Sequence, residues 1–219
     1  MRQFIPHALA AACALAAALP AHADSVTFPG FAHGSESVSY SLGAPNAVVS
    51  GSGPAGGFLT VLNGGPTFET YCVDLYQHIA FGDPPYTEYS APGTSHVFAN
   101  GNAYTDLARL YATAGVVADS VHEAAFQIAV WEIAYETTGS YDLGAGSATF
   151  SGGSAASSGA LTLASGWLAS LASSGPAIQV LESREHQDLI YAPVPEPESY
   201  ALLMAGLATV GFVARRRKA

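Results

Sequence analysis

The segment 120–135, SVHEAAFQIAVWEIAY, constrains the fold more than any other part of the chain because it is apolar on nearly every side. Apolar residues recur at helical spacing along one stripe, and three more cover the opposite side: Val121, Ala124, Ile128, Trp131 and Tyr135, then Phe126, Val130 and Ile133. A helix that is apolar all round is stable only in an interior. We therefore expect the rest of the domain to surround this helix.

The same helix carries polar residues that need partners. Ser120 and Glu123 have the spacing of a capping box, in which the serine accepts from the first turn and the glutamate reaches back to it. Gln127 lies on the flank of the helix, one turn before Trp131. A buried carboxamide is costly without hydrogen bonds, so we expect Gln127 to have partners on another element.

The remaining pattern predicts strands, then helices, then a final strand. Short alternating runs bounded by glycine and proline predict strands at 37–42, 46–51 and 57–64, and a longer strand at 67–80. Loops are expected at 81–96 and in the Gly/Ser-rich stretch 138–160, helices at 103–114 and 160–173, and a returning strand at 177–183. The predicted fold class is α+β, with N-terminal and C-terminal strands forming a sandwich or barrel-like sheet and an inserted helical segment.

The N-terminus has the three parts of a secretory signal peptide. Arg2 is followed by an apolar run from Ala8 to Leu19 and by the sequence AHA at 21–23. We expect residues 1–23 to be removed, and Cys13 with them. The predicted domain covers residues 24–192.

The C-terminus, residues 193–219, has a different three-part pattern. A proline–glutamate cluster precedes a short apolar stretch at 200–214, and the chain ends in a basic group; the residues are Pro195, Glu196 and Pro197, then Arg215, Arg216 and Arg217. This tail resembles the PEP-CTERM sorting signal of Gram-negative bacteria. The resemblance implies an exosortase as partner, transient anchoring in the inner membrane through the apolar helix, and delivery to the cell surface or extracellular matrix.

Charge excludes one large class of partners. Between Asp24 and Pro195 the chain has fifteen acidic residues and only two basic ones, Arg109 and Arg184, so its net charge is near −13. Nucleic acids and anionic lipids are bound mainly through lysine and arginine. Nucleic-acid binding is therefore excluded for this domain.

Cys72 is the only cysteine left after export, which is unusual because exported proteins normally use cysteines in pairs. A thiol can also react with a side-chain carboxamide, releasing ammonia and leaving an internal thioester. The sequence TYCVD at 70–74, followed by AFQIAVW at 125–131, resembles the two motifs of the thioester domains of bacterial surface adhesins. Phe126 stands where that family favours threonine.

The resemblance implies a thioester between Cys72 and Gln127. Its function would be one-shot covalent attachment, without enzymatic turnover or a cofactor. The target would be an amine or hydroxyl on an extracellular polymer or cell surface, as in adhesion or biofilm formation. Tyr71 and Trp131, which flank the two residues, are predicted to shield the bond from water.

Other functions remain open. A non-covalent structural protein of the extracellular matrix shares every feature except the bond. A cysteine hydrolase or transglutaminase-like enzyme needs a histidine and a carboxylate, for which the candidates are His78, His96, His122, Asp74, Asp106 and Asp119. A metal site from these histidines with Asp74 or Asp83 lacks short ligand spacing, and we expect none. Three tyrosines are candidates for a carbohydrate-stacking face: Tyr76, Tyr86 and Tyr89.

Overall fold

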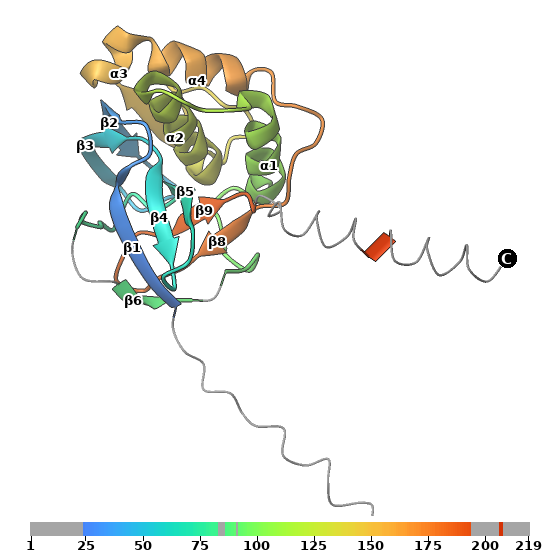
Figure 1. Ribbon diagram of the computed structural model, residues 1–219. Coiled ribbons are helices and arrows are strands. Elements are labelled where there is room, and N and C mark those ends of the chain that lie inside the picture. Colours follow the sequence, from blue (N-terminus) through green and yellow to red (C-terminus); the bar gives the residue numbers. More distant parts are fainter. Residues whose placement is uncertain (1–23, 83–85, 91, 194–205, 208–219) are drawn as a thin grey trace, which may run out of the picture.

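The domain is α+β, as predicted, and consists of two antiparallel sheets and four helices in the part of the chain that the structure describes (Figure 1). The structure is a computed structural model that describes residues 24–82, 86–90, 92–193 and 206–207. The signal peptide predicted at 1–23 lies outside these residues, as do Pro195, Glu196, Pro197, the basic end and nearly all of the apolar stretch 200–214.

The larger sheet has the strand order β6-β1-β4-β5-β9-β8 and the smaller one β3-β2-β7. The strands of the larger sheet are β6 (Tyr86–Tyr89), β1 (Asp24–Phe31), β4 (Phe58–Leu62), β5 (Thr67–Cys72), β9 (Leu189–Tyr191) and β8 (Gln179–Leu181). Those of the smaller sheet are β3 (Val49–Ala55), β2 (Glu36–Leu42) and β7 (Ala148–Ser151). Both sheets are open, so the expected barrel-like closure was wrong. A helix, α2, contacts strands of both sheets and fills the space between them.

The helices are α1 (Ala103–Ala114), α2 (Ser120–Tyr135), α3 (Gly153–Ser158) and α4 (Ala160–Leu168). The prediction that 120–135 forms an interior helix is confirmed, because every residue from Glu123 to Tyr135 is buried. Helix α2 packs against α1, α3 and α4 as well as against both sheets (Figure 1). Its all-round apolar surface is thus covered on every side.

The predicted capping box was wrong. Asp119 caps α2 instead, and its Oδ1 accepts from the backbone N–H of Val121 at 3.0 Å and of His122 at 2.9 Å. The Ser120 hydroxyl donates to Glu36 at 3.0 Å. An aspartate one residue earlier also places a negative charge at the positive end of the helix, and it leaves Glu123 available for contacts with the sheet.

Several strand boundaries also differ from the predictions. The strand expected at 67–80 ends at Cys72, and the one expected at 46–51 lies at Val49–Ala55. The stretch 138–160 contains β7 and α3, and Phe150 of β7 pairs with Tyr40 across the small sheet. The pairing of β9 with β5 was not foreseen. For β7 and β9 the strand partner is distant in the sequence, which local patterns do not reveal.

Four buried polar side chains, three on α2 and one at its C-cap, hold the surrounding segments in place. Each accepts a different backbone N–H: Glu123 from Gly57 at 2.9 Å, Gln127 from Cys72 at 2.9 Å, Glu132 from Asp142 at 2.8 Å, and Glu136 from Ser147 at 2.8 Å. Glu123 and Gln127 contact the large sheet, whereas Glu132 and Glu136 contact the segment leading to β7. The helix therefore organises both halves of the domain.

Glu123 shows how closely this arrangement is packed. Its Oε2 accepts from the Gly57 N–H and, at 3.0 Å, from the Tyr71 hydroxyl, while His33 Nδ1 lies 2.7 Å from Oε1. This hydrogen bond to Glu123 raises the pKa of His33. A β-carbon at position 57 would lie 2.5 Å from Glu123 Oε2, so the close approach of backbone to carboxylate requires glycine there.

We expect Glu123→Ala to lower the free energy of unfolding by about 3 kcal/mol, because it leaves the Gly57 N–H and the Tyr71 hydroxyl buried without an acceptor. Urea unfolding followed by circular dichroism measures the loss. Glu185→Ala, at an exposed glutamate, is the matched control and should change stability by less than about 0.5 kcal/mol. Equal losses in the two variants would contradict a bridging role for Glu123.

Candidate functional site

The structure brings Cys72 and Gln127 together, as the sequence predicted. The carboxamide of Gln127 lies along the backbone of Cys72: its Oε1 accepts from the Cys72 N–H at 2.9 Å, and its Nε2 donates to the Cys72 carbonyl at 2.7 Å. Both residues are about 1% exposed. Because β4 begins at Phe58, opposite Thr70, no residue of β4 pairs with Cys72. The carboxamide takes the place of that missing strand.

The thiol of Cys72 is enclosed by the turn that follows it. Its Sγ donates to the Asp74 carbonyl at 2.8 Å and accepts from the Asp74 N–H at 3.3 Å. Burial raises the pKa of Cys72, although the Trp131 indole N–H partly offsets this. That N–H is itself buried and makes no hydrogen bond of ordinary geometry, so its contact with the sulfur is a weak one. The thiol is therefore neutral at physiological pH.

A cavity of about 250 Å³ gives access to these residues. Cys72, Gln127 and Trp131 line it together with an aromatic group, Phe31, Phe58 and Phe81. The rings of Phe31 and Phe81 are 4.7 Å apart, and those of Phe58 and Phe81 are 5.6 Å apart. His78 also lines the cavity, and among the described residues no aspartate, glutamate, lysine or arginine does. The carboxylates of Asp74 and Asp188 act on the thiol without lining this space.

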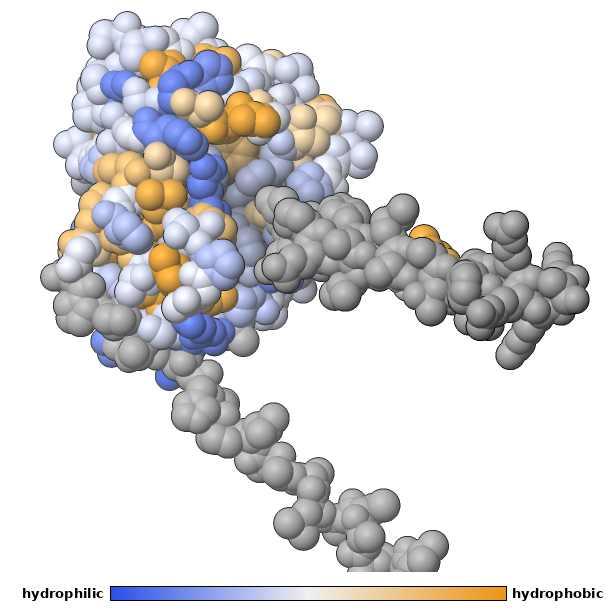
Figure 2. Space-filling model, in the orientation of Figure 1, coloured by the Kyte–Doolittle hydropathy of each residue, from blue (hydrophilic) through white to orange (hydrophobic). Residues whose placement is uncertain are grey.

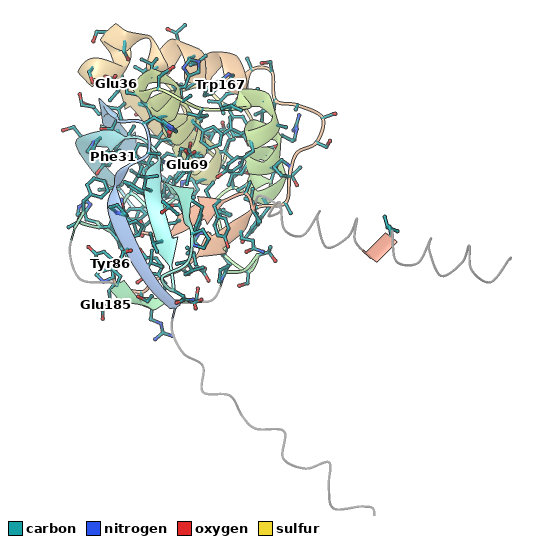
Figure 3. All side chains as sticks on the ribbon, viewed as in Figure 1. Phe31, Glu36, Glu69, Tyr86, Trp167 and Glu185 are labelled. Atoms are coloured by element: carbon teal, nitrogen blue, oxygen red, sulfur yellow. The ribbon has the colours of Figure 1, made fainter. Side chains whose placement is uncertain are left out.

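The surface near the cavity mouth combines apolar and hydrophilic areas. Figure 2 shows apolar residues over β1, and a hydrophilic band runs beside them down the same face. Figure 3 places Phe31, the last residue of β1, at the apolar side and Glu69 within the middle of the face. Phe81 is 40% exposed, so part of the aromatic group is open to solvent.

The two predicted shielding residues occupy different places. Trp131 is 4% exposed and forms part of the cavity wall with Cys72 and Gln127. Tyr71 is buried, but its hydroxyl binds Glu123 and it does not line the cavity. Phe126, at the position where threonine was the expected family residue, packs against Tyr71 with ring centroids 4.4 Å apart. Phe126 therefore belongs to an aromatic cluster in the core.

The histidines considered for a cysteine enzyme are dispersed. His96 binds Glu182 at 2.8 Å, and His122 binds the helix cap Asp119 at 2.7 Å. Asp106 binds Arg109 at 2.7 Å and the Tyr141 hydroxyl at 2.6 Å. Asp74 accepts from the Tyr76 N–H at 2.7 Å. Of these candidates only His78 lines the cavity that contains Cys72.

In the part of the chain that the structure describes, two groups of side chains have the spacing to hold a metal ion: His33 with Glu69 and Glu123, and His96 with Glu182 and Asp188. Burial raises the pKa of Asp188 to about 6. Sequence reasoning missed both groups because their members lie far apart in the chain and form no motif. The three tyrosines that were candidates for a carbohydrate-stacking face do not share an exposed surface, since Tyr89 is completely buried, whereas Tyr76 is 43% exposed.

Residues 193–218 match the PEP-CTERM protein-sorting motif. The chain ends in a sorting signal. The motif indicates an exported protein that is sorted by an exosortase, which confirms the predicted sorting signal; anchoring in the inner membrane and delivery to the cell surface or matrix stay predictions. No curated protein and no solved structure matches the chain, so the resemblance to adhesin thioester domains stays a prediction. Within the described residues, no helix has both the length and the apolar character needed to cross a membrane.

We expect Gln127→Ala to destabilise the domain by about 1–3 kcal/mol, because it leaves the buried N–H and carbonyl of Cys72 without partners. Urea unfolding of the purified chain measures this loss. Gln179→Ala is the matched control, since Gln179 accepts a hydrogen bond from the Tyr191 hydroxyl at the partly buried edge of the sheet. A loss no larger than that of the control would show that the carboxamide is not needed to hold Cys72.

Proposed function

We propose that this exported protein carries an internal thioester between Cys72 and Gln127 and uses it once, for covalent attachment to an extracellular target. The observation that supports the proposal is the pairing of the Gln127 carboxamide with the backbone of Cys72 in the wall of an uncharged cavity. The sorting motif supports the location, because a PEP-CTERM protein is delivered outside the cytoplasm.

The hydrogen bonds around Gln127 suit acyl transfer. The Cys72 N–H bound to Oε1 polarises the carboxamide and stabilises the negative charge that develops on oxygen when sulfur attacks the carbonyl carbon. A bond forms between Sγ and Cδ, the Cδ–Nε2 bond breaks, and the thiol proton leaves with the nitrogen as ammonia. When Nε2 leaves, its hydrogen bond to the Cys72 carbonyl is lost. The hydrogen bond from the Cys72 N–H to Oε1 remains, so the acyl oxygen keeps its donor.

The second step transfers the acyl group to the target. An incoming amine or hydroxyl adds to Cδ, the C–S bond breaks, and the sulfur takes the proton that the nucleophile loses. The product is an amide or ester between the side chain of residue 127 and the target, with the Cys72 thiol restored. Because the acyl group stays on the target, the protein acts once and is not an enzyme with turnover.

The second candidate is a non-covalent structural protein of the extracellular matrix. It is favoured by the same two hydrogen bonds, which satisfy the backbone of Cys72 whether or not a thioester forms. Under this alternative Cys72 is a buried thiol and Gln127 a structural amide. The two candidates differ in the covalent state of these residues alone.

We expect the purified full chain to have an intact mass one ammonia below the calculated value when prepared without reducing agent or amine buffers. Methylamine should then add as a covalent adduct on residue 127, because it opens the thioester. Cys72→Ala is the control and should show neither the mass loss nor the adduct. An unmodified mass with a thiol that alkylates freely on unfolding would overturn the thioester and leave the structural protein.

The tail gives an independent test of the location. We expect replacement of Pro195, Glu196 and Pro197 by alanine to retain the protein in the inner membrane, because an exosortase no longer recognises the motif. Cell fractionation, with epitope tags inside the domain and after Ala219, distinguishes retained from processed chains. Glu198→Ala is the control. Equal release of both variants from an exosortase-containing Gram-negative host would contradict this route.

A further inference from the structure

The outward face of the small sheet presents six hydroxyl groups in two rows. Ser39 on the central strand β2 lies opposite Ser52 and Ser151, and two positions further along Ser41 lies opposite Ser50 and Thr149. Adjacent strands are about 4.8 Å apart, so each row places three hydroxyls at regular spacing. We call these six residues the hydroxyl face. The alternate residues of β2, Val38, Tyr40 and Leu42, face the interior.

The hydroxyl face is hollowed and uncharged. A depression of about 430 Å³ lies over it and is lined by the six residues together with Tyr40 and Gly51. Ser41, Ser50, Ser52 and Ser151 are exposed. The domain has fifteen acidic residues, but none of the described residues that line this depression carries a carboxylate. A surface of neutral donors and acceptors suits a neutral ligand that is itself rich in hydroxyl groups.

This depression adjoins the cavity of Cys72 and Gln127. Tyr40 and Ser52 line both hollows; because Tyr40 faces the interior and Ser52 faces outward, the two hollows lie on opposite sides of the small sheet and are separated by its edge strand β3. A β-carbon at Gly51 would lie 2.8 Å from the Tyr40 hydroxyl, so glycine at this position lets the tyrosine lie against β3. On the cavity side, Figure 3 places Phe31 next to the small sheet. A chain molecule lying on the hydroxyl face reaches the cavity of the reactive pair by passing over the edge of β3, where Gly53 and Pro54 also line the cavity.

The cavity wall contains a buried polar group whose one contact, with the Cys72 sulfur, is weak. The Trp131 indole N–H is buried, is without a hydrogen-bond partner of ordinary geometry, and belongs to a residue in the cavity wall. An unpaired buried donor costs free energy unless an acceptor enters. The oxygen of a neutral ligand would satisfy it, whereas a cationic group would meet a donor and no carboxylate.

We propose that the target of the thioester is a neutral polysaccharide that binds along the hydroxyl face and presents one of its hydroxyl groups to the bond between Cys72 and Gln127. The hydroxyl residues bind the chain, the aromatic group at the cavity contacts its sugar rings, and the Trp131 N–H donates to an oxygen of the entering sugar. This inference rests on the proposed thioester and names the class of its acceptor.

The acyl transfer to a hydroxyl balances without any charged species. The sugar oxygen bonds to Cδ of residue 127, the C–S bond breaks, and the proton of the hydroxyl passes to Sγ. Burial raises the pKa of Cys72, which favours departure of the sulfur as a thiol. A lysine side chain, in contrast, is an ammonium ion at neutral pH and must lose its proton before it can attack Cδ. A hydroxyl needs no such step, and no described carboxylate lines the cavity to accept that proton.

Two measurements on the full chain test this inference. In the first, the thioester form is incubated with cellohexaose, with glycerol at equal hydroxyl concentration, or with a lysine peptide, and ester or amide adducts are followed by intact mass. We expect cellohexaose to react about tenfold faster than glycerol, because binding on the hydroxyl face raises its local concentration.

The double variant Ser39→Ala/Ser41→Ala should slow the reaction with cellohexaose about fivefold. Ser173→Ala/Ser174→Ala, at exposed serines beyond α4, should leave it unchanged.

In the second, binding of cellohexaose to Cys72→Ala is measured by calorimetry, since this variant keeps the carboxamide contacts and cannot react. Binding that is weakened by the Ser39/Ser41 pair supports the saccharide surface even if the intact mass shows no thioester. A thioester that forms but reacts with cellohexaose no faster than with glycerol overturns the inference and leaves the proposed function intact. Faster reaction with the lysine peptide overturns it too, in favour of a protein target.

Discussion

The fold depends on buried hydrogen bonds between the side chains of α2 and the backbone of the segments around it. An apolar helix can be buried against many partners, but it does not by itself specify their positions. Glu123, Gln127, Glu132 and Glu136 do so because each accepts a particular backbone N–H in a place where water is absent. Such contacts are strongly directional, and leaving any of them unmade is costly. The helix thus sets the relative placement of the two sheets.

The candidate site is part of this same system of contacts. Gln127 holds the end of β5 with both atoms of its carboxamide, one turn along the helix from Glu123, which holds β4 and Tyr71. The contact that gives Cys72 its structure is also the contact that an acyl transfer needs, a carboxamide polarised by the Cys72 N–H. If the proposed thioester forms, stability and reactivity depend on the same hydrogen bond, and the loss of Gln127 is expected to affect both.

Charge is distributed unevenly in this domain. Its surface is strongly acidic, whereas the cavity beside Cys72 and the hydroxyl face next to it contain no charged residue. An acidic surface repels anionic polymers and keeps the exported protein soluble. The two hollows, whose described linings contain no carboxylate, lysine or arginine, instead suit neutral ligands, as the proposed polysaccharide target would be.

The sequence by itself determined the interior helix, the position of α1, the sorting signal and the need of Gln127 for partners, because each depends on local periodicity or on a contiguous motif. It did not predict the strands β7 and β9, and it predicted the wrong helix cap and a barrel-like sheet. Only the tertiary structure decided that Glu123 reaches Gly57 and Tyr71, that Ser39 and Ser41 lie in register with four other hydroxyl residues, and that Tyr71 points away from the cavity. These features arise from strand register and helix orientation, which depend on contacts between residues distant in the chain.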